Sequence, residues 1–271
     1  MVANTSSWEA LSAQLTQASS SKGRRVLDAS VAEGWRLLER ALAAGVLPSG
    51  VLVGERVSSR PRPDEVRVLT KLRAAGVSCL TAPQDALEAH TAGRTFGDLV
   101  GLVPMFDPGL SALLQTLSPV ERHPGLSLLV GVQVLDPGNI GALTRTAHAL
   151  GAGGAVWVGG TDPRHPKALR ASMGSCFRLP WTHCNLAPEV VVQRLRATGW
   201  TSYATVTRGG TLLESEISGR SAIWMGGEAH GLPPAVVAAC DAQVRIAMRE
   251  EVDSLSINAA AAVIMSRAFS S

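Results

Sequence analysis

The chain has few of the residues that build metal sites and disulfide frameworks. It contains four cysteines among 271 residues, and no two of them form a CxxC pair, so the sequence predicts neither a zinc site nor a disulfide framework. The six histidines lack ligand spacing, and the adjacent pair His183 and Cys184 is typical of a loop beside Trp181. We therefore expect no bound metal, and we expect inert thiols at Cys79, Cys176, Cys184 and Cys240.

Long apolar runs are absent as well. The longest purely apolar stretch covers residues 259–265, far below the roughly 20 residues that a membrane helix needs. The start of the chain, residues 1–7, lacks the basic region followed by an apolar region that a secretory signal would have. These absences predict a cytoplasmic protein without a membrane partner.

Two motifs of nucleotide and ester chemistry are missing. The sequence contains neither a GxxxxGK[ST] phosphate loop nor a GxSxG nucleophile elbow. Gly151, Gly153 and Gly154 cluster, but they follow an expected helix and precede an expected strand, whereas the dinucleotide fingerprint runs from strand to helix. The cluster therefore favours a turn at a helix C-terminus over a Rossmann-type site.

Composition otherwise describes a globular protein with a sizeable core, since 46% of the residues are apolar. The net charge of +3 is too small by itself to indicate a nucleic-acid partner. Only three of the 25 basic residues are lysine, and the planar fork of arginine suits phosphate contacts. A GC-rich genome explains the same bias, so composition leaves both interpretations open.

Helix and strand patterns divide the first half of the chain into three segments. Residues 1–22 are polar with a short helical stripe, which predicts a frayed helix and tether. Residues 23–104 predict a small α/β domain, with helices over 31–45 and 66–75 and strands over 51–53 and 77–80. Residues 105–124 directly follow Pro104, hold three more prolines around a short helix, 110–117, and are predicted to be a linker.

From residue 125 to residue 271, near-continuous apolar strands alternate with helices. This pattern predicts an α/β fold with a parallel sheet covered on both faces. The expected strands are 126–134, 155–158, 177–179, 201–206, 222–225 and 244–246, and the expected helices are 140–150, 166–173, 188–198, 234–239 and 254–269. Residues 259–264 carry no polar side chain, so we expect the last helix to be buried all round, in a core or against a second subunit.

Two motifs carry basic side chains that could meet phosphate. Arg145 follows the turn Asp136-Pro137-Gly138-Asn139 on the second turn of a helix, where it could hold a phosphate or a ribose oxygen. A helix N-cap by Asp136 or Asn139 with a surface arginine explains this spacing equally well. Arg164, Lys167 and Arg170 recur every three residues, so they share a helix face that could follow a phosphate backbone or simply be solvated.

A third motif places a carboxylate at the end of a strand. Glu228 lies in the Gly-rich turn 226–231 directly after the apolar strand 222–225, at the edge where open α/β sheets bind ligands. It could orient a substrate or act as a base, although surface glutamates are common in turns. Ser254 is predicted to be the N-cap of the final helix, a role that needs no ligand.

Taken in order, the motifs at 136–147, 223–233, 244–248 and 252–261 resemble the SpoU (TrmH-like) family of SPOUT-class RNA 2′-O-ribose methyltransferases. The resemblance implies a trefoil knot in the C-terminal α/β domain, S-adenosylmethionine as cofactor, and a homodimer packed through the first-motif helix and the last helix. It implies methyl transfer to a ribose 2′-hydroxyl of RNA. By position, the catalytic residues would be Arg145, Glu228 and Ser254, supported by Asn139, and the cofactor would bind Gly226, Gly227, Ile246, Met248 and Leu255.

The role of Arg145 within this resemblance follows from its chemistry. A guanidinium has a pKa above about 12, which makes it a costly general base. We therefore expect Arg145 to orient the ribose hydroxyl and its 3′-phosphate.

Residues 23–104 look like the substrate-binding domain that precedes many such catalytic domains, and residues 31–38 carry the likeness. This added domain favours ribosomal RNA over transfer RNA as the substrate. RNA contacts are predicted there at Arg24, Arg25, Arg56, Arg60 and Arg62, although a solvated surface explains scattered arginines equally well.

Three positions depart from the family pattern. Gly227 stands where the family usually has Asn, Ser256 ends a triplet that is usually Ser-Leu-Asn, and Ala247 replaces Pro. We hypothesise that Asn258, early in the final helix, substitutes for the missing Asn. The departures at Gly227 and Ser256 support one alternative, a catalytically inactive RNA-binding dimer of the same fold. A transfer RNA 2′-O-methyltransferase stays open as a second alternative.

Overall fold

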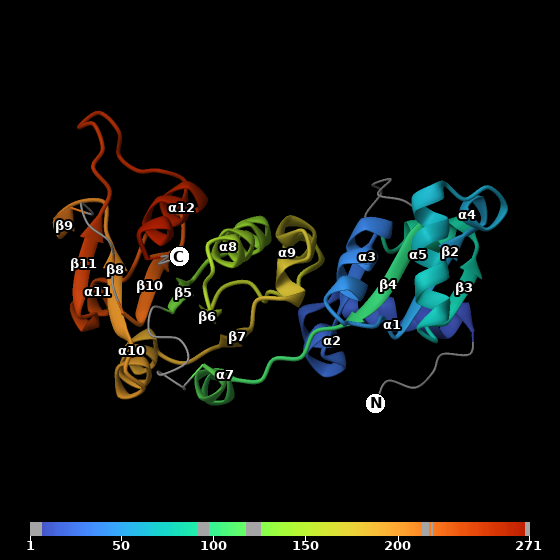
Figure 1. Ribbon diagram of the computed structural model, residues 1–271, viewed down its shortest axis with the longest axis horizontal. Coiled ribbons are helices and arrows are strands. Elements are labelled where there is room, and N and C mark those ends of the chain that lie inside the picture. The colour runs from blue at the N-terminus through green and yellow to red at the C-terminus, as the bar shows by residue number, and fades with distance from the viewer. Residues whose placement is uncertain (1–6, 92–97, 118–125, 213–216, 218, 269–271) are drawn as a thin grey trace. The chain divides into compact units, whose positions relative to one another are not determined.

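The computed structural model describes residues 7–91, 98–117, 126–212, 217 and 219–268. They form two compact units (Figure 1). The first unit contains Met1–Phe106 and Arg164–Phe177, and the second contains Asp107–Pro163 and Arg178–Ser271. One stretch from the middle of the chain therefore belongs to the first unit.

The first unit is built on a four-stranded sheet with the order β1 (Ala29–Glu33), β4 (Leu99–Pro104), β2 (Gly50–Gly54) and β3 (Cys79–Ala82). β4 pairs antiparallel with β1 and β2, and β2 pairs parallel with β3. The helices before residue 106 are α1 (Trp8–Ser19), α2 (Ser21–Leu27), α3 (Trp35–Ala43), α4 (Glu55–Ser59), α5 (Pro63–Ala74) and α6 (Gln84–Glu88).

The short helix expected near the N-terminus exists as α1, but the prediction that it is a frayed tether was wrong. Leu11, Leu15 and Ala18 on one face of α1 are each 0% exposed. They pack in one apolar cluster with residues of β1, β2 and β4. The helical stripe in the sequence is therefore the core-facing side of α1.

The helix predicted over residues 31–45 begins later in the structure. Residues 29–33 form the fully buried strand β1, and Gly34 then turns the chain with φ of 83° before α3 begins at Trp35. All five residues of β1 are buried, Ser30 and Glu33 among them, so the strand lacks the apolar and polar alternation that would mark it in the sequence.

A second correction concerns the basic motif at residues 164–170. Helix α9 (Pro166–Ser172) belongs to the first unit, and Arg164 lies before it rather than on its face. The Arg164 side chain, 4% exposed, pairs with Asp28 at 2.8 Å, and Arg170 pairs with the buried carboxylate of Glu33 on β1. These two arginines anchor α9 to the sheet and do not share an open helix face. One partner of each pair is buried, Arg164 in the first and Glu33 in the second, so loss of the other partner is expected to be destabilising.

The second unit has a seven-stranded sheet, and every strand pairing in it is parallel, which confirms the prediction. The strand order is β7 (Trp181–Cys184), β6 (Gly154–Val158), β5 (Ser127–Val132), β10 (Ser221–Gly226), β8 (Thr201–Thr205), β11 (Ala242–Arg245) and β9 (Thr211–Leu212). The strand predicted over 177–179 was wrong, because a short 3₁₀ helix covers Ser175–Phe177. β7 begins only after Pro180, which has no N–H for a ladder.

Helices cover both faces of this sheet. On one face, α7 (Leu110–Thr116), α10 (Pro188–Ala197) and α11 (Pro234–Ala239) enclose the larger apolar cluster, which includes Trp224 and alternate residues of β5. On the other face, α8 (Pro137–Ala149) packs against α12 (Ile257–Ala268), as Figure 1 shows. The predicted linker therefore contains a helix, α7, that is part of a core, while residues 118–124 lie outside the described residues.

The expectation that the last helix is buried all round was wrong for the single chain. Ile257, Ala261 and Ile264 of α12 are buried, whereas Val263 is 42% exposed and its neighbour Ala262 is exposed as well. One apolar face of α12 is thus open. Among the described residues, no helix is both long and apolar enough to cross a membrane.

Candidate active site

A cavity of about 470 Å³ lies in the second unit at the carboxyl ends of β8, β10 and β11. Three chain segments supply most of its lining: the turn after β10, the irregular stretch that follows β11, and α12. Carboxyl ends of parallel strands are where open α/β sheets bind ligands. Eight residues named from the sequence line it together, namely Asn139, Gly226, Gly227, Glu228, Ile246, Met248, Ser254 and Leu255.

The turn after β10 is folded so tightly that two of its residues must be glycine. A Cβ on Gly226 would stand 2.0 Å from the carbonyl carbon of Gly231. A Cβ on Gly227 would stand 2.2 Å from the carbonyl oxygen of Gln133, the residue that follows β5. Asparagine cannot replace Gly227 without a shift of this backbone, so the departure from the family pattern at this position is built into the turn.

Asp136 rather than Asn139 is the N-cap of α8. Its carboxylate accepts hydrogen bonds from the backbone N–H groups of Gly138 and Asn139. The cap satisfies orphan donors of the helix. The Asn139 side chain is therefore free to serve the cavity.

A chain of three polar side chains borders the cavity. The amide nitrogen of Asn139 donates to a carboxylate oxygen of Glu228, and the amide nitrogen of Asn258 donates to the amide oxygen of Asn139 at 2.7 Å. The direction of this chain is fixed by its end, because an ionised carboxylate only accepts. Asn139 must offer its NH₂ group to Glu228, so its oxygen must face a donor, which Asn258 supplies.

The predicted N-cap role of Ser254 was wrong. α12 begins at Ile257, and the Ser256 hydroxyl accepts a hydrogen bond from the backbone N–H of Ala259 at 3.3 Å. Ser256 thus caps the helix. Ser254 lies before the cap, in the irregular segment, where it lines the cavity.

Arg145 does not line this cavity in the same chain, although the sequence grouped it with Asn139 and Glu228. It is exposed on α8, six residues after Asn139. Six residues of α-helix amount to an advance of about 9 Å and a rotation of about 120° away from the first side chain. Helix geometry therefore directs Arg145 to a different side of α8 from Asn139.

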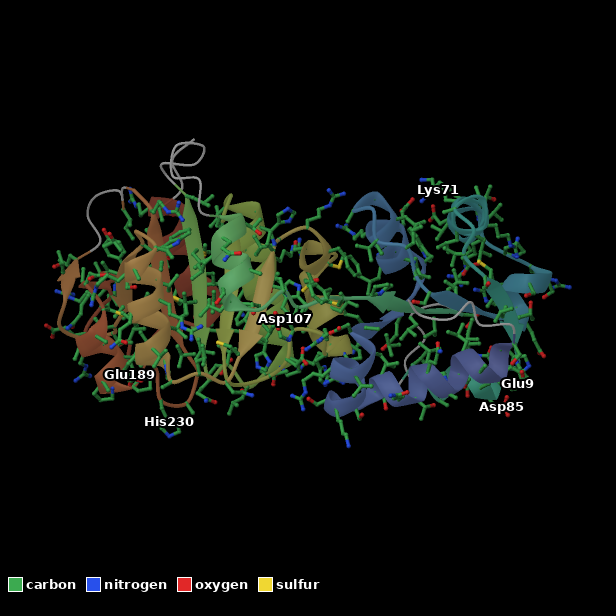
Figure 2. All side chains as sticks on the ribbon, turned by 90° about the horizontal axis from the view of Figure 1, so that it is seen from below. Glu9, Lys71, Asp85, Asp107, Glu189 and His230 are labelled. Carbon is green, nitrogen blue, oxygen red and sulfur yellow. The ribbon has the colours of Figure 1, made fainter. Side chains whose placement is uncertain are left out.

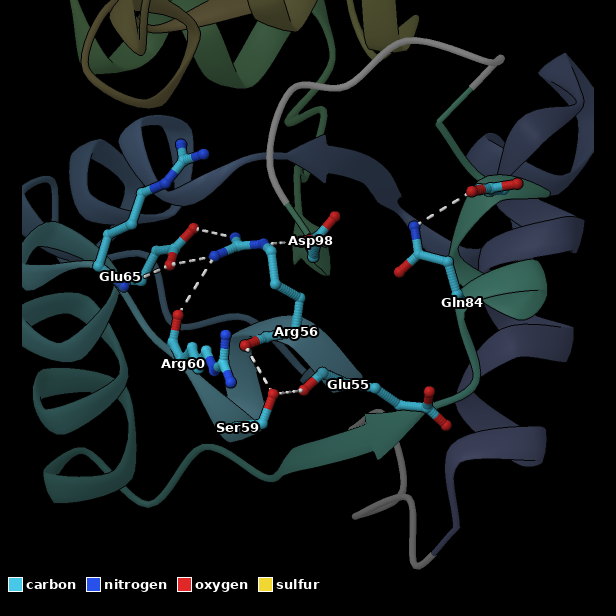
Figure 3. A network of polar contacts seen from close by, with 9 residues as sticks. Glu55, Arg56, Ser59, Arg60, Glu65, Gln84 and Asp98 are labelled. Atoms are coloured by element: carbon cyan, nitrogen blue, oxygen red, sulfur yellow. Dashed lines mark hydrogen bonds and ion pairs between the residues drawn. The ribbon is translucent and has the colours of Figure 1, made fainter.

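The arginines named in the first unit fall into two groups. Arg24 is 3% exposed and donates to the backbone oxygens of Ala18 and Ser19. Arg56 bridges the carboxylates of Glu65 and Asp98, and the hydrogen bond that Arg56 donates to Glu65 is the main cause that raises the pKa of Arg56 (Figure 3). Both side chains hold the fold together. The predicted RNA contacts whose side chains are exposed in this unit are Arg25, Arg60, Arg62 and, on α9, Lys167.

Several lining residues had no signal in the sequence. Thr205, Val206 and Thr207 enter the cavity because β8 lies next to β10 in the sheet, and a sequence does not give the strand order. His230 lines the outer end of the turn after β10, where Figure 2 shows it pointing away from the ribbon. The Thr205 hydroxyl donates to the backbone oxygen of Trp224 at 2.8 Å, which fixes its orientation.

Fold and cavity together define an α/β protein in which three sequence motifs form a ligand site at one edge of a parallel sheet. Residues 127–266 match the model of the SpoU rRNA Methylase family, and the chain belongs to this family. It is 28% identical to the 23S rRNA (guanosine(2553)-2'-O)-methyltransferase RlmP of Bacillus subtilis over 246 residues, 90% of each chain. It is 30% identical to an uncharacterized tRNA/rRNA methyltransferase of Synechocystis, over 96% of this chain and 91% of the relative.

Solved structures agree with this assignment. The SpoU methyltransferase AviRb of Streptomyces viridochromogenes, in complex with AdoMet, superposes with a TM-score of 0.80 at 25% identity and covers 94% of this chain and 95% of its own. An AdoMet-bound rRNA methyltransferase of Sinorhizobium meliloti superposes with a TM-score of 0.78 at 26% identity, over 95% of this chain and 93% of its own. The similarity thus extends over both units.

Proposed function

We propose that this protein transfers the methyl group of S-adenosylmethionine to a ribose 2′-hydroxyl of ribosomal RNA. The observation that carries the proposal is the cavity at the sheet edge, where residues of all the family motifs meet. Support comes from the relatives that match nearly the whole chain, one named as a 23S rRNA 2'-O-methyltransferase and another solved with AdoMet.

The cavity suits this cofactor in size and in chemistry. Its volume of about 470 Å³ lies within the usual range for small-ligand sites. Ile246, Met248 and Leu255 provide apolar walls, and all three lie outside helices and strands, so backbone groups near them are available to a ligand. Gly226 and Gly227 would hold it by close backbone approach. When bound, the cofactor supplies an electrophilic methyl group on a sulfonium.

The polar side chains at the cavity would position the ribose. A ribose hydroxyl is a poor nucleophile, so the site must align it and accept its proton. Glu228, oriented by Asn139, is the carboxylate that can accept this hydrogen bond, and Ser254 can contact the same ribose. We assign the aligning role to these three residues.

We further propose that Arg145 serves the cavity of a second copy of the chain. Its place on α8 directs it away from Asn139, and the open apolar face of α12 around Val263 lies on the helix that packs against α8. A homodimer through α8 and α12 would cover that face. It would also let the Arg145 guanidinium orient the hydroxyl and its 3′-phosphate in the partner's cavity.

Three finer features belong to the same proposal. The segments after β10 and β11 would form a trefoil knot around the cofactor, since both line one cavity. The first unit would bind RNA through its exposed side chains, among them Arg25, Arg60, Arg62 and Lys167. A protein that modifies ribosomal RNA works where ribosomes are assembled, so we propose the cytoplasm as its location.

The test is isothermal titration of the purified protein with S-adenosylmethionine, followed by methyl transfer to total ribosomal RNA and to total transfer RNA. We expect binding at one site per chain and label in ribosomal RNA. Label in transfer RNA alone would select the transfer RNA enzyme instead. Absence of cofactor binding would favour a catalytically inactive RNA-binding dimer.

A further inference from the structure

A second pocket adjoins the candidate active site. It has a volume of about 340 Å³ and shares three wall residues, Thr207, Ile246 and Met248, with the first cavity. The family resemblance assigns Ile246 and Met248 to the cofactor, but it gives no role to the other residues of this pocket. A ligand in this pocket would lie directly beside the methyl-transfer site.

Three arginines from separate segments converge on this pocket. Arg208 follows β8, Arg245 ends β11, and Arg249 lies in the irregular stretch before α12. They outnumber the two carboxylates in the lining, those of Glu250 and Asp253. The excess of guanidinium groups makes the pocket suitable for an anion.

These arginines are not neutralised by strong ion pairs. Arg208 lies 3.7 Å from Asp253, but the two side chains are 86% and 94% exposed, and such surface pairs are weak. Arg245 and Arg249 form no ion pair with any residue that the structure describes. Three guanidinium groups therefore remain available to a ligand.

We propose that this pocket binds a backbone phosphate of the substrate RNA, next to the ribose that is methylated. The proposal rests on the proposed function, because it places RNA in the adjoining cavity. Every ribose within an RNA chain is flanked by phosphates, so a phosphate site must adjoin a ribose site. The planar arginine fork matches phosphate oxygens. S-adenosylmethionine carries a sulfonium and an ammonium against a single carboxylate, so a ligand with this net positive charge does not account for three arginines.

The test compares Arg208→Gln and Arg249→Gln with Arg194→Gln, a matched control. Arg194 is an exposed arginine of α10 in the same unit and lines neither cavity. The affinity for a short fluorescein-labelled single-stranded RNA of mixed sequence is measured by anisotropy over a series of salt concentrations. Cofactor affinity is measured by titration calorimetry, and thermal unfolding checks that each variant is folded.

We expect each pocket variant to lose about tenfold in RNA affinity, as for the loss of a charge-assisted hydrogen bond. The slope of log affinity against log salt should fall by about 0.7 for each lost phosphate contact. Cofactor affinity should not change, and Arg194→Gln should behave as wild type. Salt slopes equal to that of the control would overturn the proposal. A parallel loss of cofactor affinity would overturn it too, because the pocket would then belong to the cofactor.

Failure of this proposal is distinguishable from failure of the proposed function. If the wild-type protein transfers no methyl group to ribosomal RNA, the proposed function is wrong, while the salt slopes still decide whether the pocket binds phosphate. If the wild-type protein is active, kcat/KM for ribosomal RNA should fall about tenfold in Arg249→Gln.

Discussion

Replacement of Asn258 by aspartate is the sharpest perturbation of the polar chain beside the cavity. Asparagine and aspartate have nearly the same shape, so the helix and its packing are kept. A carboxylate cannot donate, however, and it would face the amide oxygen of Asn139, which is also an acceptor. To avoid this contact the Asn139 amide must rotate, and its oxygen would then face Glu228. Of the two hydrogen bonds, the one between positions 139 and 258 is re-formed in the opposite direction, because the rotated NH₂ group donates to the new carboxylate, and the one to Glu228 is lost.

The magnitude follows from the bond that is lost. A neutral hydrogen bond contributes about 1 kcal/mol and one to a charged group about 1.5–3 kcal/mol. Because the bond to the charged Glu228 is the one lost, Asn258→Asp should lower kcat by about 10-fold to 140-fold, at roughly 1.4 kcal/mol per factor of ten. Asn258→Ala leaves the Asn139 amide free to keep its orientation, so it should lose only about fivefold. Asn258 itself does not line the cavity, which makes it a positioning residue.

The assay is single-turnover methyl transfer to ribosomal RNA, with cofactor affinity and thermal unfolding measured on the same samples. Asn185→Asp is the matched control, since Asn185 is exposed and lines neither cavity. Both Asn258 variants should bind cofactor as wild type does. Equal activity of Asn258→Asp and Asn258→Ala would refute the reasoning, because it would show that the orientation of the Asn139 amide has no effect.

Three further outcomes are expected. Arg145→Lys should lose most methyl-transfer activity although the charge is kept, since lysine lacks the planar fork, and near-normal turnover would count against this role. Gly227→Asn restores the usual family residue, but its Cβ would stand 2.2 Å from the backbone oxygen of Gln133. We expect this variant to bind S-adenosylmethionine about tenfold or more weakly. An unchanged affinity for S-adenosylmethionine in titration calorimetry would contradict the argument that the turn requires glycine. Burial lowers the pKa of His90 from its usual 6.5, so the folded state favours the neutral ring. The contribution of His90 to the free energy of unfolding is therefore complete above about pH 6.5, and it is lost as the pH falls through the lowered pKa of the folded state. His90→Gln should therefore reduce the loss of denaturant stability between pH 7 and pH 5, in comparison with wild type.

The fold of the second unit and most of its cavity could be predicted from the sequence. Apolar strands alternating with helices dictate a parallel sheet, and polar turns at the ends of such strands meet at one edge. This rule brings Glu228 and Met248 to one cavity without knowledge of the strand order. The same rule does not predict that Thr207 lines the cavity, because that position depends on β8 lying beside β10 in the sheet.

The remaining differences arise from partners that are distant in the sequence and from local ambiguity. Arg164 has the spacing of an RNA-facing residue, but its carboxylate partner Asp28 is 136 residues away. There a tertiary contact overrides a local preference. The error at Ser254 is local instead, because two nearby serines can cap a helix, and α12 begins at Ile257 with Ser256 as its cap.

The central claim is ribose 2′-O-methylation, and its most direct test identifies the product. Ribosomal RNA incubated with the protein and isotopically labelled S-adenosylmethionine would be digested to nucleosides and analysed by mass spectrometry. The account predicts one labelled 2′-O-methylated nucleoside with the wild-type protein and a large loss with Glu228→Gln, whose amide still fits the turn but accepts a proton poorly. A label on a base, or no label in RNA from a protein that binds the cofactor, would contradict it.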